Sequence, residues 1–361
     1  MQINFSDYDL SEFIVKEDLF CGIPAKLIIP NHIGTKFNQK NKIFRSSIWD
    51  LNGKLLSASY PKFVNMFENP DNFPFYDDGE HIFVDKIDGS TGILDWVNFQ
   101  LSIRTRGSYS YTQMENARDF EEALTSELID WVKNNPDYSV LTEITSPRNV
   151  IVLNYGEKPE YWLTGIVNKN DYSLLSQSEL DKIAQKINLR RPQYYKFDSI
   201  TDAISNIKLW KNKEGVVCYN EKYGAMHKIK AEEYLARHRF KESANLESVC
   251  ELFIQWNCPN KEEFKEKLIS NFDFECYSMV ESFIPIILNA YSLTQKYFHD
   301  INNCILPYYL NNTPRKEAAL AIIKQYSGLG LTSFAFQALD GKKFGIDEIK
   351  KLMKQILKIK W

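Results

Sequence analysis

A change of hydrophobic pattern about two thirds of the way along the chain sets the strongest limit on its fold. Up to about residue 236, short runs of alternating apolar and polar residues are separated by turn residues, which is the pattern of β-strands. Beyond that point the apolar residues recur with helical spacing and the strand pattern stops. The sequence therefore predicts an α+β domain built on antiparallel sheets, followed by an all-helical domain.

The individual elements follow from the same patterns. Strands are expected over residues 25–29, 43–50, 81–86, 99–104, 139–144, 150–154, 215–219 and 227–230. One helix is expected over 115–133, and five more near 246–256, 261–270, 276–302, 314–326 and 346–358, with a tight helix connection over 327–334. The polar stretch 237–243 has no apolar repeat, so we place the domains at 1–238 and 239–361.

Composition narrows the class of protein. Apolar residues make up 44% of the 361 residues and aromatic residues 14%, which is enough to build real cores. The N-terminus lacks a basic region followed by an apolar stretch, and the longest apolar run, near 283–288, is too short to span a bilayer. Six cysteines without a C-x-x-C pair indicate reduced thiols. We therefore expect a cytoplasmic protein, in the host cytoplasm if it is viral, with no membrane partner.

Lys86 stands in a segment that suits a covalent reaction at phosphorus. The segment 81–90 reads His-Ile-Phe-Val-Asp-Lys-Ile-Asp-Gly-Ser, an alternating apolar run that ends in Lys86 and turns at Gly89. A strand would fix the backbone of the lysine, and the glycine would let the chain turn closely around a ligand. Because Lys-x-Asp-Gly occurs by chance in roughly one chain in ten of this length, other motifs must support it.

Further charged residues accompany Lys86 in a consistent order along the chain. They are Arg45 and Lys62 upstream, and Arg106, Glu143, Glu214, Lys228 and Lys230 downstream. In this order they resemble the covalent nucleotidyltransferase superfamily of ligases and capping enzymes. Within it the chain is most similar to the phage RNA ligase 1 type, through Pro-Arg-Asn-Val-Ile-Val at 147–152 and through Tyr234. The resemblance covers about residues 40–240.

The resemblance implies a reaction in three steps. Lys86 would attack the α-phosphorus of ATP, expel pyrophosphate and hold AMP through a phosphoramidate. The AMP would pass to a 5′-phosphate end of RNA, and a 3′-hydroxyl would then displace it and seal the strand. The implied co-substrate is ATP, and the implied cofactor is Mg²⁺, for which Mn²⁺ could substitute. Each step displaces at phosphorus, where catalysis is chiefly positioning and charge neutralisation.

Roles for the other residues follow from chemical type and from the resemblance. Lys228 and Lys230 alternate with Ile229, so both amines should face the α-phosphate as part of the catalytic set with Lys86. Glu214 starts a strand and is the expected Mg²⁺ ligand. Glu143, flanked by apolar residues, is expected to be half-buried, and in similar enzymes this carboxylate accepts a hydrogen bond from the ribose.

The expected site also contains three cationic side chains, and it requires a lowered pKa for Lys86. Arg45, Lys62 and Arg106 suit the phosphates of ATP or of the RNA end. The amine of Lys86 must be neutral to attack, so its pKa has to fall from about 10.4. We expect Lys228, Lys230 and the metal to lower it.

Some residues depart from the family pattern. Ile87 stands where an acidic residue is common, Val64 replaces an aromatic residue, and Arg106 stands where lysine is usual. In the segment 30–34, where nucleotide-contacting tyrosines can occur, only His32 is available, and we interpret it as structural. A helix face with Lys350, Lys354 and Lys358 is interpreted as solvated, with contact to RNA as the alternative.

The expected partner is single-stranded or nicked-loop RNA with 5′-phosphate and 3′-hydroxyl ends, bound by a monomer, with RNA or tRNA repair as the role. The net charge of −3 does not exclude this, because such an enzyme needs only a local basic groove. A helical second domain, the candidate RNA-specificity module, favours an RNA ligase, because related DNA ligases and capping enzymes usually continue into a β-barrel. A DNA ligase, an RNA-capping nucleotidyltransferase and a non-catalytic nucleotide- or RNA-binding module remain as alternatives.

Overall fold

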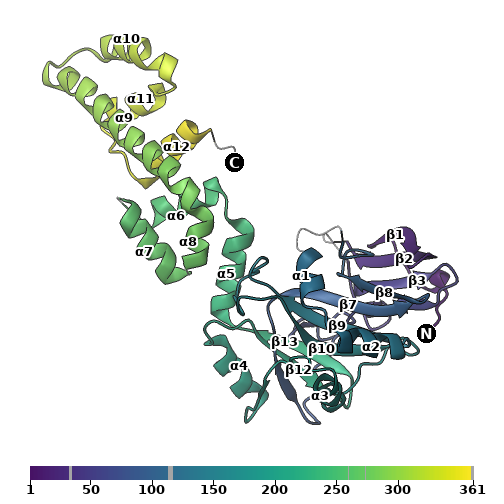
Figure 1. Cartoon of the computed structure of the whole chain (residues 1–361). Coiled ribbons are helices and arrows are strands. Elements are labelled where there is room, and N and C mark those ends of the chain that lie inside the picture. The colour runs from purple at the N-terminus through teal and green to yellow at the C-terminus, as the bar shows by residue number, and fades with distance from the viewer. Residues whose placement is uncertain (32–34, 113–116, 259, 273, 359–361) are drawn as a thin grey trace. The chain divides into compact units, whose positions relative to one another are not determined.

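The computed structural model describes residues 1–31, 35–112, 117–258, 260–272 and 274–358 (Figure 1). The chain forms two compact units, Met1–His238 and Arg239–Trp361, and the boundary falls within helix α5 (Glu232–Ser243). The first unit contains three β-sheets with covering helices. The described elements of the second unit are all helical.

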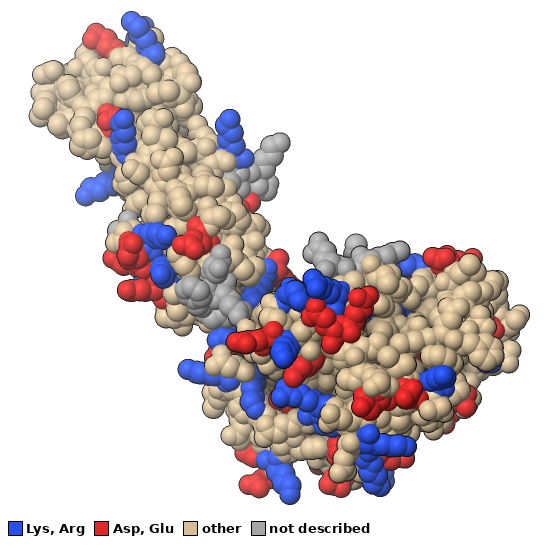
Figure 2. Space-filling model, in the orientation of Figure 1, with Lys and Arg blue, Asp and Glu red and all other residues tan. Residues whose placement is uncertain are grey.

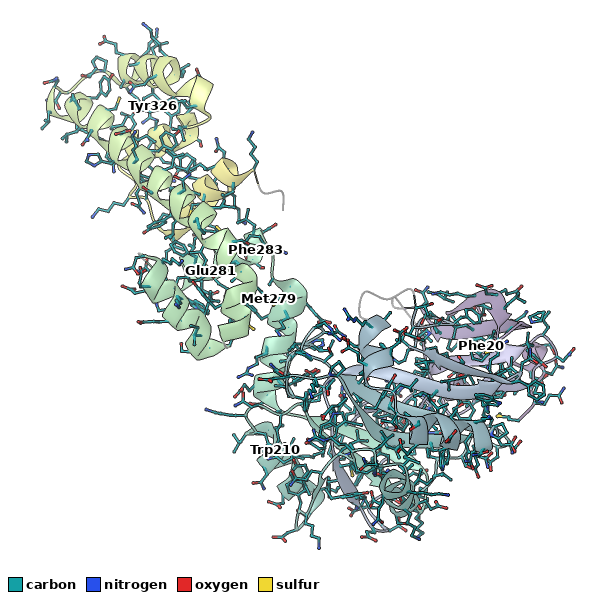
Figure 3. The ribbon with its side chains drawn as sticks, viewed as in Figure 1. Phe20, Trp210, Met279, Glu281, Phe283 and Tyr326 are labelled. Carbon is teal, nitrogen blue, oxygen red and sulfur yellow. The ribbon has the colours of Figure 1, made fainter. Side chains whose placement is uncertain are left out.

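The first sheet of the N-terminal unit is a four-stranded antiparallel meander. It has the order β1 (Phe13–Phe20), β2 (Ile23–Pro30), β3 (Ser47–Asp50), β4 (Leu55–Ser57). A tight turn at Cys21 and Gly22 joins the first two strands, and both residues have positive φ, 50° and 79°. Phe20 packs into the core of this sheet at 1% exposure (Figure 3).

Two further sheets contribute the strands that surround the site. The second sheet has the order β10 (Glu160–Asn168), β9 (Tyr138–Thr145), β7 (Ser90–Val97), β8 (Gln100–Arg104), and all its pairs are antiparallel. The third has the order β11 (Tyr194–Tyr195), β6 (Ile82–Asp85), β12 (Gly215–Asn220), β13 (Ala225–Lys230), β5 (Val64–Asn65). Only the β13–β5 pair is parallel among the pairs of this sheet.

Short helices cover these two sheets. They are α1 (Ala117–Glu122), α2 (Ser126–Asn134), α3 (Gln177–Lys186) and α4 (Ile200–Lys208). The same unit also has the 3₁₀ turns η1 (Phe5–Asp7) and η2 (Lys42–Arg45), of which η2 contacts β2. Helix α2 buries Leu128 and Val132 against the second sheet, while α4 buries Ala203 and Ile207 against the third. The helices therefore hold the outer faces of the sheets, and the charged residues of the site face the other way.

The C-terminal unit is built around one long helix, α9 (Ile284–Leu310). The other helices are α6 (Leu246–Gln255), α7 (Lys261–Asn271), α8 (Phe274–Val280), α10 (Arg315–Tyr326), α11 (Thr332–Leu339) and α12 (Ile346–Leu357), with 3₁₀ turns η3 (Glu281–Phe283) and η4 (Ser327–Leu329). Two apolar clusters lie along α9, one of which includes Tyr326 (Figure 3). None of the helices in the described part of the chain is long and apolar enough to cross a membrane.

Several expected elements differ from those observed. The helix expected over 115–133 is two helices, because the side chain of Thr125 caps a new helix by accepting from the backbone N–H of Leu128. Residues 115 and 116 lie outside the described residues. The expected strand at 43–50 begins only at Ser47, after η2. The polar stretch 237–243, which the sequence suggested as the place of the domain boundary, belongs to helix α5.

Two more differences concern long-range contacts. The expected strand at 150–154 is an irregular loop, because its backbone N–H groups bond a buried carboxylate rather than a neighbouring strand. Lys350 and Lys354 on α12, interpreted above as a solvated face, lie 2.9 Å and 3.7 Å from the carboxylate of Glu251 on α6. These lysines therefore help to join two helices of the C-terminal unit.

Acidic and basic side chains are mixed over the visible face of the N-terminal unit (Figure 2). No region of one sign dominates this face among the described residues.

Candidate active site

A pocket of about 510 Å³ lies between the second and third sheets of the N-terminal unit. It brings together seven of the eight predicted site residues, namely Arg45, Lys86, Arg106, Glu143, Glu214, Lys228 and Lys230. Lys62, the eighth, lines a smaller hollow next to it. His32 lies outside the described residues. Because these residues come from positions 45 to 230, only the folded chain assembles the pocket.

Lys86 is the first residue after β6 and is fixed by its backbone as well as its side chain. Its backbone N–H donates to the carbonyl of Gly215 at 2.9 Å, which ties it to the start of β12. Gly215 has φ of 140°, and a Cβ there would lie 2.0 Å from the carbonyl oxygen of Ile229. Only glycine fits this crossing, so the backbone around Lys86 is closely defined.

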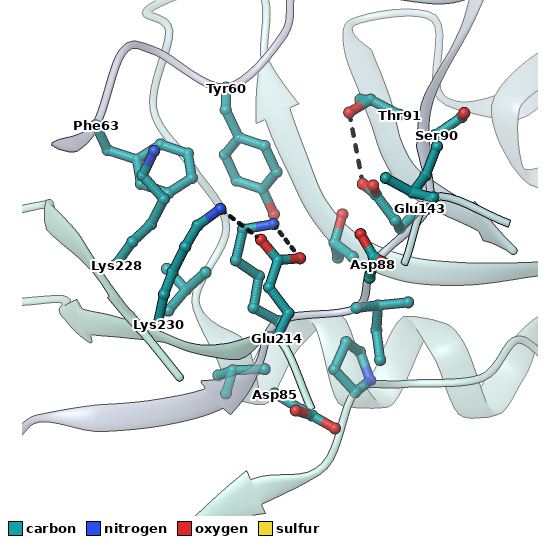
Figure 4. A pocket seen from close by; sticks show the side chains of 18 of the residues that line it. Tyr60, Phe63, Asp85, Asp88, Ser90, Thr91, Glu143, Glu214, Lys228 and Lys230 are labelled. Carbon is teal, nitrogen blue, oxygen red and sulfur yellow. Dashed lines mark hydrogen bonds and ion pairs between the residues drawn. The ribbon is translucent and has the colours of Figure 1, made fainter. Parts of the chain in front are cut away.

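Glu214 holds two lysines at once (Figure 4). Its Oε2 lies 2.8 Å from Nζ of Lys86, and its Oε1 lies 2.8 Å from Nζ of Lys230. The carboxylate is only 2% exposed. Burial raises the pKa of Glu214, but the two ammonium groups outweigh this and hold the pKa below its usual value. Glu214 is therefore ionised and anchors Lys86.

This pairing corrects the expected titration of Lys86. Burial lowers the pKa of Lys86, but the carboxylates of Glu214 and Glu143 outweigh it, so the pKa lies above its usual value. The expectation that the neighbouring lysines lower the pKa of Lys86 is wrong for this arrangement of the chain's own residues.

The lowered pKa belongs instead to Lys228. Burial, together with the charges of Arg45 and Lys86, lowers the pKa of Lys228 to about 7. Its Nζ lies 5.2 Å from the ring centroid of Phe63, and the guanidinium of Arg45 lies 4.9 Å from the same ring. Neither cation forms an ion pair with a residue that the structure describes. Phe63, which the sequence did not single out, contacts both cations.

Glu143 lies on β9 across the pocket and is half-buried, as expected. Burial raises the pKa of Glu143 to about 7, although the nearby Lys86 acts in the opposite direction. Its Oε2 lies 3.5 Å from the hydroxyl of Thr91, which is a weak hydrogen bond at most (Figure 4). A carboxylate with so few partners is able to accept a hydrogen bond from a ligand.

Asp88, the acidic residue of the Lys-x-Asp-Gly motif, supports the site from behind. Its Oδ2 accepts from the backbone N–H groups of Val152 and Leu153 at 2.7 and 2.8 Å, and its Oδ1 accepts from the hydroxyl of Tyr234 at 2.8 Å. Asp88 is only 4% exposed. It therefore ties the segment after Lys86 to two distant parts of the chain. The motif itself was the signal for this residue, although its role was not predicted.

Arg104 is a second support that sequence reasoning missed. It is fully buried, and its guanidinium donates to the hydroxyl of Ser46 at 2.8 Å and to that of Ser57 at 2.7 Å. The hydroxyl of Ser46 in turn donates to the backbone carbonyl of Arg106 at 2.7 Å. Ser46 directly follows Arg45, so one buried arginine fixes the backbone beside both pocket arginines. No local pattern marks Arg104, because its partners are distant in sequence.

A side chain of the pocket and a bound ligand could hold a divalent cation together. Among the described residues no group of three or more side chains could hold a metal ion. Mg²⁺, however, is often bound by one carboxylate and the phosphates of a nucleotide. Glu214 is suited to this in type and position, provided that it releases one of its lysines.

The region that forms this pocket matches a known family. The model of the family described as RNA ligase matches residues 37–244, which is more than half of the 361-residue chain. The chain belongs to the RNA ligase family. The resemblance drawn from the motifs is thereby confirmed.

One curated relative of this RNA ligase family member comes from Autographa californica nuclear polyhedrosis virus. It is named as a candidate bifunctional polynucleotide kinase/RNA ligase and is 27% identical over 194 residues. The match covers 48% of this chain and 25% of that protein. The chain therefore corresponds to about a quarter of the length of this relative.

Solved structures with similar folds include three that carry ligase names. An archaeal ATP-dependent RNA ligase is 14% identical with a TM-score of 0.47, over 78% of this chain and 74% of that one. A Naegleria gruberi RNA ligase mutant with ATP and Mn is 14% identical with a TM-score of 0.41, over 66% and 83%. A candidate ATP-dependent DNA ligase from Aquifex aeolicus is 14% identical with a TM-score of 0.46, over 79% and 78%.

Proposed function

We propose that this chain is an ATP-dependent RNA ligase that joins 5′-phosphate and 3′-hydroxyl RNA ends through lysyl-AMP on Lys86. The supporting observation is the placement of Lys86 in a pocket that also holds Arg45 and Lys228, two cations without an ion-pair partner among the described residues. An uncompensated buried cation is costly, and a bound phosphate would neutralise it. Membership of the RNA ligase family supports RNA joining as the reaction.

The first step forms a bond from Nζ of Lys86 to the α-phosphorus of ATP and breaks the bond to the β-phosphate, so pyrophosphate leaves. The amine must first be deprotonated, and its ion pair with Glu214 at 2.8 Å opposes this. Glu214 therefore has to release Lys86 before the reaction. A Mg²⁺ ion brought with ATP and held by Glu214 would supply charge neutralisation at the phosphates.

The other pocket residues would bind and orient the ATP and the RNA end. Lys228 and Lys230 lie on one face of β13 with Ile229 buried behind them, so both amines can contact the α-phosphate. Arg45 and Arg106 suit the outgoing pyrophosphate or the 5′-phosphate of the RNA. Glu143 suits a ribose hydroxyl, whose hydrogen bond it would accept in its ionised form.

We assign the adenylyltransferase role to residues 1–238, which contain the pocket, and RNA specificity to residues 239–361. The physiological role that fits this chemistry is repair of cleaved RNA or tRNA in the cytoplasm, carried out by a monomer. Comparing discharge of the lysyl-AMP by full-length tRNA halves and by short unstructured RNA would test the specificity assignment. A chain with no preference between them would contradict it.

The deciding experiment incubates the protein with Mg²⁺ and α-labelled ATP or GTP, and then adds 5′-phosphate RNA or DNA. We expect label on the protein from ATP, which RNA discharges into a sealed product. Label from GTP would indicate a capping enzyme, discharge by DNA alone would indicate a DNA ligase, and no label would indicate a non-catalytic module.

The matched variant is Lys86→Arg, which keeps a cation beside Glu214 but removes the amine nucleophile. We expect loss of at least about 1,000-fold in lysyl-AMP formation, since an arginine remains protonated. The melting temperature should stay close to that of the wild type because the ion pair survives. A Lys86→Arg variant that still becomes labelled would place the nucleophile elsewhere.

A further inference from the structure

A small hollow of about 60 Å³ adjoins the main pocket and has a different charge. Phe63 lines both cavities and forms the partition between them. The residues that line the hollow include Lys42 and Lys62 but neither aspartate nor glutamate. The main pocket, in contrast, contains four carboxylates, those of Asp85, Asp88, Glu143 and Glu214. The hollow is therefore the purely cationic part of this surface.

Lys42 and Lys62 are held side by side by the backbone. The N–H of Lys62 donates to the carbonyl of Lys42 at 2.7 Å. Lys42 begins the 3₁₀ turn η2, which ends at Arg45, so one short turn delivers a cation to the hollow and another to the main pocket. The two cavities are thus built on shared elements, and a ligand in one lies next to a ligand in the other.

Neither lysine of the hollow forms an ion pair with a described residue, although the carboxylate of Glu68 acts on Lys62 from a longer distance. Nζ of Lys42 donates to the neutral side-chain oxygen of Gln39 at 2.7 Å, and Nζ of Lys62 lies 5.3 Å from the ring centroid of Phe37. Burial lowers the pKa of both amines. Half-buried Lys26 of the same unit, in contrast, is paired with Glu17 at 3.1 Å. Two adjacent cations that are partly desolvated and unpaired are suited to an anionic ligand.

An aromatic pair forms the opposite wall of the hollow. The rings of Tyr76 and Tyr223 are stacked, with centroids 4.1 Å apart and an interplanar angle of 12°. Tyr223 is 41% exposed as a residue, and Nζ of Lys222 lies 4.9 Å from the centroid of its ring. The nearby carboxylate of Asp78 is neutralised by Lys222 at 2.7 Å. Cations beside an exposed aromatic ring suit single-stranded nucleic acid, whose phosphates and bases need these two surfaces.

The cavity on the far side of this hollow is lined in part by acidic residues. A larger cavity of about 730 Å³ shares Lys42 and Tyr223 with it, but its other side carries Asp171, Glu179 and Glu221. These carboxylates would repel a phosphate chain. The cationic surface next to the main pocket is therefore short, which fits one phosphodiester and its base rather than a long duplex.

We propose that this hollow binds a phosphodiester of the RNA strand next to the joining site, with the phosphate on Lys42 and Lys62 and a base against the Tyr76–Tyr223 pair. The inference rests on the proposed RNA ligase function. A strand phosphate is favoured over a phosphate of ATP because the main pocket, on the other side of Phe63, is large enough for a nucleotide and has its own cations.

The test compares Lys42→Ala, Lys42→Arg and Tyr223→Ala with Lys182→Ala, which removes an exposed lysine of the same unit that lines none of these cavities. Binding of a fluorescent 5′-phosphate RNA is measured by anisotropy at several salt concentrations, without ATP. We expect Lys42→Ala to weaken RNA binding about tenfold and to reduce the salt slope by about 1. Lys42→Arg should restore both, Tyr223→Ala should weaken binding about fivefold or more, and Lys182→Ala should leave it unchanged.

Lysyl-AMP formation from labelled ATP, measured without RNA, separates the possible ligands. For Lys42→Ala we expect the ATP dependence of this step to match the wild type. A raised KM for ATP with unchanged RNA binding would assign the hollow to the phosphates of ATP, and no change in either measurement would show that it binds no substrate phosphate. Both results overturn the inference. A wild-type protein that binds RNA but never forms lysyl-AMP would overturn the proposed function instead.

Discussion

The cations on the two sides of the candidate active site differ in whether a carboxylate pairs with them. On one side, the buried carboxylate of Glu214 holds Lys86 and Lys230, both at 2.8 Å. On the other side, Lys228 and Arg45 lie over Phe63 and have no acidic partner among the described residues. The single carboxylate of Glu214 offsets part of the positive charge on the first side, whereas no ion pair among the described residues offsets the charge on the second side. The comparison separates residues that stabilise the empty site from residues that are kept for the ligand.

The largest stability effect is expected on the paired side. Glu214→Gln would leave two partly buried ammonium groups without a counter-charge, so we expect a loss of about 3 kcal/mol in the free energy of unfolding. Urea denaturation measures this. Glu160→Gln is the matched control, because its partner Arg190 is 56% exposed and the pair should contribute less than about 0.5 kcal/mol. Equal effects of the two variants would mean that the burial of Glu214 does not matter.

Substitution of a cation on the unpaired side should raise the free energy of unfolding instead of lowering it. Lys228→Met removes a buried cation with no partner, so at pH 6 we expect the variant to be more stable than the wild type, by about 1–2 kcal/mol. Because the folded-state pKa of Lys228 is about 7 and the unfolded value is 10.5, its cost is full below pH 7 and disappears as the pH rises toward 10.5.

The advantage of Lys228→Met should therefore shrink between pH 7 and pH 9 in urea denaturation, while lysyl-AMP formation falls at every pH. A variant that is less stable than the wild type at pH 6 would show that Lys228 is already paired in the empty site. The distinction between a paired and an unpaired side would then be wrong.

Glu143 should make stability depend on pH less strongly than Lys228 does, and in the opposite direction. Its folded-state pKa is about 7, above the ordinary value of 4.5, so the wild type should lose stability as the pH rises from 4.5 through about 7. Glu143→Gln, which cannot ionise, should not show this loss. Melting temperatures of both proteins between pH 5 and pH 8 measure the difference. Parallel curves for the two proteins would rule out a buried, ionising Glu143.

The smallest effect is expected for Ser46→Ala, which should change only the positions of Arg45 and Arg106. The variant removes the hydroxyl that links Arg104 to the backbone of Arg106. We expect the KM for ATP to rise by about threefold to tenfold, with kcat changed less, since one hydrogen bond contributes about 1 kcal/mol. Ser46→Thr keeps the hydroxyl and should recover part of the loss. An unchanged KM in Ser46→Ala would show that Arg45 and Arg106 do not depend on this link.

The sequence predicted the local parts of this site better than its connections. The run that delivers Lys86 and the alternation of Lys228, Ile229 and Lys230 are local patterns, and β6 and β13 are found there. The contact between Lys86 and Glu214 joins residues 128 positions apart, and no local pattern contains it. The same holds for Arg104, whose partner Ser46 is 58 positions away. Long-range pairing also decided the titration of Lys86, which the sequence predicted in the wrong direction.

Secondary structure shows the same limit. The run at 150–154 has the composition of a strand, but Asp88 takes two of its backbone N–H groups, so no ladder forms. The break at Thr125, in contrast, could have been read from the sequence, because threonine followed by an acidic residue is a common helix start.

The attachment of this loop to Asp88 has a practical consequence for engineering. Surface loops are usually where a tag or a new chain end can be placed without harm. The peptide between Val152 and Leu153 is a poor choice, because an insertion there would pull both N–H groups away from the carboxylate and disturb the segment that follows Lys86. The exposed residues 156–158, where nothing lies within 4 Å of a side chain added at Gly156, are the better cut site for a circular permutant.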